Sequence, residues 1–185
     1  SSLEAARRQW SAAPKDSNPR EGKEDPAGYP LAMIRPDLKD IPPAPLAEGF
    51  RFRPMTRNDG PLWTLLQREA EEYFPIGEDL FAQEFGGNPA AIPQRCFFIE
   101  AVNGVAAGTI SAWYNDDFKD RSWGQVHWVA VRPCFQRRGL ARAGLAETLR
   151  TLAQWHDRAL LFTQSKRAPE SCTDARARAA SAPAT

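Results

Sequence analysis

The sequence has few of the cysteines and histidines that build metal sites and disulfide frameworks, and it lacks a long apolar run. Only three of its 185 residues are cysteine and only two are histidine. Cys96, Cys134 and Cys172 are odd in number, far apart and without metal-site spacing, so the sequence predicts no metal centre and a reducing compartment. No apolar run approaches the length of a membrane span, and the N-terminus lacks the hydrophobic core of a signal peptide. We expect a cytoplasmic protein without a membrane partner.

The chain also lacks a strong excess of charge. Its formal net charge is +1, which gives no overall attraction to nucleic acid, so the arginines are expected to act locally. There is no internal repeat. A length of 185 residues predicts one folded domain once a disordered end is subtracted.

Large apolar residues are scarce at both ends of the chain. Residues 1–28 are predicted to be disordered, and residues 29–49 form an extended Pro-rich arm in which 31–34 could be a short edge strand. The predicted core spans residues 50–164. Residues 165–185 are predicted to form a disordered tail, because no large aliphatic or aromatic residue follows position 163.

The core alternates helical and extended patterns. Asn103 and Gly104 predict a type I′ hairpin turn between two of the strands. Strands are predicted at residues 50–53, 96–102, 105–114, 123–131 and 159–163, and helices at 61–73, at 79–85 and from the loop at Gln136 to about His156.

A phosphate-binding junction is predicted where the strand ending at Val131 leads into the last helix. The intervening segment is Gln136-Arg137-Arg138-Gly139-Leu140-Ala141. The first N–H groups of a helix have no partner within it, the helix dipole adds positive charge, and a glycine lets a ligand approach the main chain. The alternative is a helix N-terminus that only carries solvated arginines.

This segment resembles the Q/R-x-x-G-x-G/A signature of the GCN5-related N-acetyltransferase (GNAT) superfamily, and the order β-α-α-β-β-β-α-β over residues 50–163 is similar too. The resemblance implies an α/β (α+β) fold with a mixed, mostly antiparallel central sheet flanked by helices. It also implies that acetyl-CoA binds through its pyrophosphate to the loop and through its pantetheine arm to the preceding strand. The implied cofactor-binding residues are Val129, Ala130, Val131, Gln136, Arg137, Arg138, Gly139, Leu140, Ala141 and Arg142.

The C-terminal part departs from the family pattern. Members normally continue with another helix and two strands, which the composition of residues 164–185 cannot form. We expect a truncated or frame-shifted coding sequence, with a naturally short tail as the alternative. The strand at 159–163 would then be an exposed sheet edge through which the chain could associate.

His127 is the candidate catalytic base, because an unperturbed imidazole titrates near neutrality and a similar histidine helps relay the amine proton in arylalkylamine acetyltransferases. Regular alternation would place His127, Val129 and Val131 on one face of the strand. The alternative is a hydrogen-bonded core histidine. Gln125 cannot take a proton, Glu100 is a weaker candidate base, and Tyr114 is only a distant substitute for the missing general acid.

Aromatic and acidic side chains could shape an acceptor site or could simply build core and surface. The aromatic set is Tyr73, Phe74, Trp113, Tyr114, Trp123 and Trp128, and the acidic set is Glu69, Glu71, Glu72, Glu78 and Asp79. Aromatic rings can hold an ammonium group, but they more often fill a core, and a charge run on a helix is usually solvated.

The leading interpretation is an N-acetyltransferase that moves an acetyl group from acetyl-CoA to an amine of a small molecule or protein. One alternative is a catalytically impaired acyl-CoA-binding remnant of such an enzyme. Another is an interaction module that binds no coenzyme A, which the agreement of loop and element order disfavours.

Overall fold

The computed structural model describes residues 30–71 and 75–164. The chain divides into two compact units, one of residues Ala32–Phe162 and one of Ser1–Leu31 with Thr163–Thr185. The architecture given below is that of the first unit, with the outer ends of its first and last strands. The predicted disordered segments, 1–28 and 165–185, lie outside the described residues.

Six strands form one sheet in the order β1-β6-β5-β4-β3-β2. Neighbouring strands from β2 to β5 are antiparallel, with Phe52 opposite Ile99 and Ala112 opposite Val126, whereas β5 and β6 are parallel. The predicted mixed, mostly antiparallel sheet is therefore confirmed. The strands are β1 (Pro30–Arg35), β2 (Phe50–Pro54), β3 (Cys96–Ala101), β4 (Ala106–Asn115), β5 (Trp123–Val131) and β6 (Ala159–Gln164).

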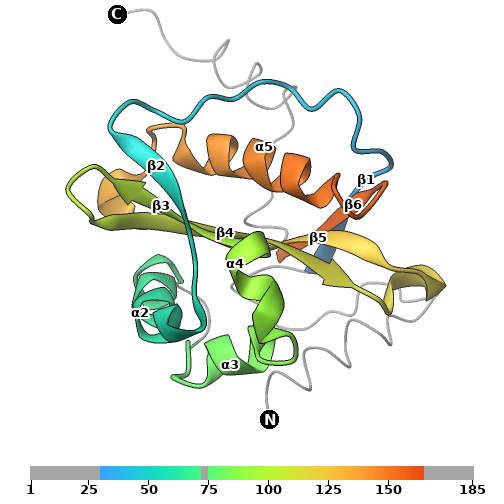
Figure 1. Ribbon diagram of the computed structural model, residues 1–185, viewed down its shortest axis with the longest axis horizontal. Coiled ribbons are helices and arrows are strands. Elements are labelled where there is room, and N and C mark those ends of the chain that lie inside the picture. The colour runs from blue at the N-terminus through green and yellow to red at the C-terminus, as the bar shows by residue number, and fades with distance from the viewer. Residues whose placement is uncertain (1–29, 72–74, 165–185) are drawn as a thin grey trace, which may run out of the picture. The chain divides into compact units, whose positions relative to one another are not determined.

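Helices cover both faces of the sheet (Figure 1). Helix α5 (Leu140–Leu152) lies on one face, while α2 (Gly60–Ala70) and α3 (Leu80–Phe85) lie on the other, and the short α4 (Ile92–Arg95) leads into β3. Strand β1 and helix α4 are additional to the predicted core order. Single 3-10 turns occupy 57–59, 89–91, 118–120 and 133–135.

Helix α2 begins and ends with local sequence signals. Thr56 and Asp59 form a capping box on the preceding turn, and Pro61 occupies the first turn of the helix, where its missing N–H costs nothing. The helix buries Trp63 and Leu66 against the sheet. It ends at Ala70, earlier than predicted, and the predicted acceptor-site residues Tyr73 and Phe74 lie outside the described part of the chain.

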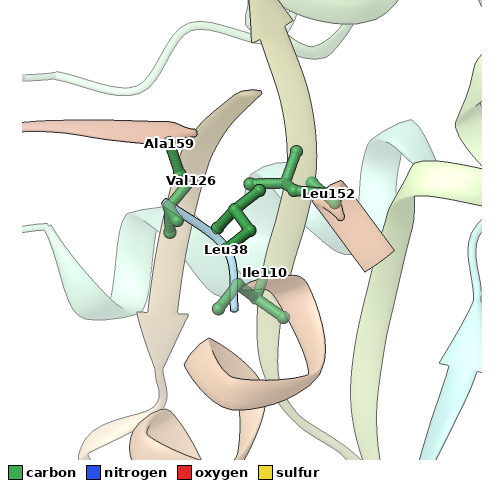
Figure 2. Close-up of a cluster of buried hydrophobic side chains, with 6 residues drawn as sticks. Leu38, Ile110, Val126, Leu152 and Ala159 are labelled. Atoms are coloured by element: carbon green, nitrogen blue, oxygen red, sulfur yellow. The ribbon is translucent and has the colours of Figure 1, made fainter. Parts of the chain in front are cut away.

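The core beneath α5 includes a residue from the Pro-rich arm. Leu38 packs with Ile110, Val126 and Leu152 (Figure 2). Its backbone N–H donates to the carbonyl of Asp157 at 3.0 Å. The hydrophobic core therefore extends N-terminal to Phe50, where the sequence pattern of the core begins.

Leu38→Ala is expected to lower the free energy of unfolding by about 2 kcal/mol, because it removes buried methyl groups and leaves a cavity. This value lies at the low end of the usual cost of a buried Leu→Ala substitution, because the arm that carries Leu38 can partly fill the cavity. Chemical denaturation measures the change. Leu65→Ala on the exposed side of α2 is the control, since its side chain is 50% exposed and the change should stay within about 0.5 kcal/mol. Equal losses in the two variants would show that Leu38 is not part of the core.

Strand β6 is not an edge of the sheet, which corrects the prediction of an exposed edge at 159–163. Strand β1 lies beside it, so that β6 is enclosed between β1 and β5, and Leu160 is buried. The reason is that residues 31–34 do form the short edge strand that the sequence allowed. Association through an open β6 edge is therefore removed as a mechanism.

The β3–β4 connection differs from the predicted type I′ turn. Gly104 has φ +83, but Asn103 does not have a positive φ, as a type I′ turn would require. Instead, Gly104 N–H donates to the carbonyl of Ala101 at 2.8 Å, and the Asn103 side chain accepts from Val105 N–H at 3.2 Å. A single left-handed residue is enough to close this hairpin.

Candidate functional site

The loop between β5 and α5 presents unpaired backbone donors. Gly139, the residue just before α5, has φ +76, and Arg137 has φ +62. Two residues before the helix are therefore in the left-handed conformation. No side-chain hydrogen bond caps this end of α5 within the described residues. The first N–H groups of the helix and its positive dipole end are therefore available to an anion.

A hollow of about 240 Å³ lies at this helix start. Most of the predicted loop residues meet there. Its lining comprises Val131, Phe135, Gln136, Arg137, Gly139, Leu140, Ala141 and Arg142. Arg138 is not in the lining, and its guanidinium lies over the ring of Phe135, 5.5 Å from the ring centroid. Val129 and Ala130 are not in the lining either, while Gln136 donates to the carbonyl of Val131 at 3.1 Å and ties the loop to the strand.

Strand β5 contains a bulge that reverses its alternation. Thr109 lies opposite Ala130 and Ser111 opposite His127, so three residue steps of β5 match two of β4. Trp128 adopts φ +48 at this point. The extra residue puts Val131 on the α5 face, against Ile99 and Leu140, whereas His127 faces α3. The prediction that His127 and Val131 share a face is therefore wrong.

The pairing of the two parallel strands ends just before the bulge. Pairing between β5 and β6 covers Gly124–Val126 against Ala159–Leu161 and continues no further within the described residues. The stretch Val129–Val131 thus lies beyond the paired region, with its main chain still held to β4 on the other side. An extended ligand could pair with backbone groups on the open side.

His127 is held by two side chains. Its Nε2 lies 2.8 Å from Oε2 of Glu84 on α3, and its Nδ1 lies 2.9 Å from Nε2 of Gln125 on the same strand. The imidazole is 20% exposed and the Glu84 side chain 10%. The sequence predicted Gln125 beside His127 but missed Glu84. Helical spacing was the available signal, since Glu84 follows buried Leu80 by four residues and so lies on the buried side of α3.

The aromatic residues mostly build core. Rings of Trp63, Phe85, Trp113 and Trp128 contact one another at centroid distances of 5.1 to 5.8 Å, and Phe85 also contacts the imidazole of His127 at 6.0 Å. Trp123 lies elsewhere, against Phe118. This cluster supports the core interpretation of the aromatic residues and surrounds His127 with rings.

Tyr114 is engaged near the opposite end of β4 from the loop. Its ring stacks on Trp113 at 5.1 Å, and its hydroxyl accepts from the Asn88 amide at 3.1 Å. It lies opposite Gly124, three residues before His127 on β5. The structure gives it no contact with His127.

Two candidate carboxylates are held by arginines. Glu69 binds the Arg132 guanidinium through two contacts of 2.6 and 2.7 Å, which fastens α2 to the end of β5. Buried Glu100 accepts from Arg51 and from Arg53, the latter at 2.7 Å. Hydrogen bonds from Arg51 above all, and from Arg53, hold the pKa of Glu100 below its usual range despite burial. Glu100 therefore stays ionised and paired, which makes it a poor base.

The remaining acidic candidates are Glu71, Glu72, Glu78 and Asp79, and the second histidine is His156. Glu78 and Asp79 are exposed, and Glu72 lies outside the described residues. His156 follows α5, and burial lowers its pKa, so a charged interaction with the helix dipole is disfavoured there.

Two of the three cysteines lie in the described part of the chain. Cys96 and Cys134 are free thiols, and burial raises the pKa of Cys96 to about 12. Cys172 lies outside the described residues. No group of three or more metal-binding side chains occurs in residues 30–71 and 75–164, and no helix in that part is long and apolar enough to cross a membrane.

Comparisons with known proteins give the family and the fold of the chain. A model of the acetyltransferase (GNAT) family matches residues 61–170, whereas no curated protein matches the chain. A GCN5-related N-acetyltransferase from Sphaerobacter thermophilus superposes with a TM-score of 0.61 at 19% identity, over 95% of this chain and 52% of that chain. The aminoglycoside N-acetyltransferase AAC(6')-Iy, solved with CoA, gives a TM-score of 0.50 at 20% identity, over 74% of this chain and 88% of that chain.

The solved structures and the family model support different conclusions. At such identities the solved structures show a shared fold, and this chain spans about half the length of the first of them. The family model, in contrast, covers more than half of the sequence and includes α2, the bulged strand β5 and the loop before α5. The chain belongs to the GNAT acetyltransferase family.

Proposed function

We propose that this protein is an N-acetyltransferase that moves an acetyl group from acetyl-CoA to an amine. The observation that carries the proposal is the uncapped start of α5, with its left-handed Gly139 beside a hollow lined by Arg137 and Arg142. A pyrophosphate is the anion that such a cradle of main-chain donors and guanidinium groups fits. The pyrophosphate site is assigned to residues 136–142.

Free space at Gly139 supports the fit of the cofactor. A Cβ built on Gly139 has nothing within 4 Å, so it would project into open space on the side of the helix start. Beyond the paired part of β5, the pantetheine arm is proposed to bind those backbone groups of Val129, Ala130 and Val131 that pair with neither β4 nor Gln136. When bound, acetyl-CoA supplies the thioester whose acetyl group is transferred.

His127 is the proposed base. Its imidazole lies on β5, two residues before Val129, among the rings of Phe85 and Trp128. An amine reacts only after it has lost the proton of its ammonium form, and a neutral imidazole can accept that proton at physiological pH. The general acid for the departing thiolate is not assigned to any side chain, and water can provide that proton.

The acceptor is proposed as a class, an amine of a small molecule or of a protein. The AAC(6')-Iy neighbour is an aminoglycoside acetyltransferase, which makes aminoglycosides a reasonable first group to assay. The free thiols Cys96 and Cys134 support a reducing compartment, and we place the enzyme in the cytoplasm on that ground.

Acetyl-CoA should raise the melting temperature of the protein, because a ligand that binds only the folded state stabilises it. Arg137→Glu with Arg138→Glu should weaken binding roughly tenfold in calorimetry, through repulsion of the pyrophosphate. Lys119→Glu with Arg121→Glu is the matched control, since both side chains are exposed on the β4–β5 connection. Release of free thiol with a panel of aminoglycosides, alkylamines and lysine peptides then measures turnover.

The outcomes separate the functions. Undiminished affinity in the first double variant would remove the loop from the site. Binding without thiol release for any amine would favour the alternative of a catalytically impaired acyl-CoA-binding protein. Absence of binding would contradict both.

A further inference from the structure

A directional chain of hydrogen bonds runs from the β4–β5 connection to His127. The backbone N–H of Asp117 donates to Oδ1 of Asn115 at 3.1 Å, which fixes the orientation of that amide because a backbone N–H can only donate. The Asn115 Nδ2 then donates to Oε1 of Gln125 at 3.3 Å. The Gln125 Nε2 is left to donate to Nδ1 of His127 at 2.9 Å. His127 Nδ1 is therefore an acceptor and carries no proton.

The other side of the imidazole leads to the same tautomer independently. A carboxylate only accepts hydrogen bonds, and Oε2 of Glu84 lies 2.8 Å from Nε2 of His127. The proton of the neutral imidazole therefore resides on Nε2 and is donated to Glu84. The backbone N–H of Asp117 can only donate and the Glu84 carboxylate can only accept, and both lead to the same tautomer.

We propose that Glu84 is a positioning residue that holds His127 as the Nε2–H tautomer, with Nδ1 as the atom that accepts the proton of the amine. This inference rests on the proposed acetyltransferase function. In the step, an N–H bond of the ammonium breaks, an Nδ1–H bond forms, and the electron pair stays on the amine nitrogen. The side-chain amide of Gln125, which occupies the Nδ1 lone pair, must turn aside to admit the ammonium.

The imidazole and Glu84 lie in surroundings that screen their electrostatic interaction only weakly. The imidazole and the carboxylate are 20% and 10% exposed, and the rings of Phe85 and Trp128 lie against the imidazole at 6.0 and 5.8 Å. On its own strand His127 contacts neutral Gln125, and on β4 it lies opposite Ser111, so Glu84 from α3 is the charged group that the described residues bring against it. Attraction between imidazolium and carboxylate is weakly screened in such a setting, as in the carboxylate–histidine pairs of hydrolases.

The tautomer can be measured without any activity. The chain has two histidines, so a long-range ¹H–¹⁵N spectrum contains two imidazoles, and a His156→Gln sample assigns them. In the wild type we expect His127 Nε2 to give the signal of a protonated nitrogen and Nδ1 that of an unprotonated one. A spectrum with the proton on Nδ1, or with the two forms averaged, would overturn the proposal.

The role in proton transfer is tested by Glu84→Gln, whose amide oxygen can still accept from Nε2–H but carries no charge. Acetyl transfer to the best amine of the panel should slow about tenfold at neutral pH, and the shape of the pH–rate profile should change. Glu78→Gln removes the same charge from a side chain that is 88% exposed and should change neither. An unaltered rate and profile in Glu84→Gln would also overturn the proposal.

The inference and the function can fail separately. If acetyl-CoA releases no thiol with any amine, the proposed function fails, and the wild-type spectrum alone then decides whether Glu84 fixes the tautomer. If turnover is present and the spectrum shows Nδ1 protonated, the enzyme stands and the assignment of Nδ1 is wrong.

Discussion

Gly139→Asp is expected to weaken the binding of acetyl-CoA about a hundredfold. Gly139 has φ +76, nothing lies within 4 Å of its built Cβ, and it lines the hollow, so the substitution adds a carboxylate at the proposed pyrophosphate site. Like charges a few ångströms apart near a protein surface repel each other by several kcal/mol before screening by salt. Calorimetry with acetyl-CoA measures the effect, and salt should reduce it.

A matched substitution is available at Gly104. It has φ +83, and again nothing lies within 4 Å of its built Cβ, but it closes the β3–β4 hairpin. Gly104→Asp therefore imposes the same backbone strain and the same charge away from the helix start. If the two variants lose affinity equally, the effect at Gly139 arises from backbone strain or net charge, and the pyrophosphate site is misplaced.

His127→Ala is expected to lower kcat/KM on the order of a hundredfold near neutral pH, the usual contribution of a positioned base. The loss should shrink as the pH rises, because free amine then becomes abundant without a base. A pH–rate profile of the variant measures both effects. His156→Ala removes the other histidine, at the end of α5, and should leave the profile unchanged in shape.

The rate experiment has an outcome that contradicts the assignment. If the His127→Ala profile keeps its shape and height while the protein still binds acetyl-CoA, the imidazole is only a hydrogen-bonded part of the core. The ring contacts with Phe85 and Trp128 would then account for its presence.

The sequence predicted what depends on neighbours along the chain. The bounds of β5 were predicted as they stand, and the loop from Gln136 to Arg142 was predicted from a glycine, its basic neighbours and the helical spacing that follows. The local pattern of the arm also allowed β1. These features need only a few consecutive residues to specify them.

What was missed depends on distant contacts or on unusual backbone. Trp128 has φ +48, a conformation that bulky side chains rarely adopt, so the sequence did not predict the bulge or the resulting change of face. Glu84 meets His127 across 43 residues of chain. Leu38 joins the core through its position beside Ile110 and Leu152, which no local pattern around the prolines indicates.

The sheet order also has a consequence for how the protein is made. Strands β2 to β5 each pair with the strand that precedes or follows them in the sequence. The ribosome therefore synthesises each of these pairing partners directly after the previous strand. Strand β1 is different, because its neighbour β6 begins at Ala159, well over a hundred residues later. During synthesis β1 cannot pair until β6 has emerged, and closing so long a loop is the slow kind of contact formation. We therefore expect β1 to join the sheet last.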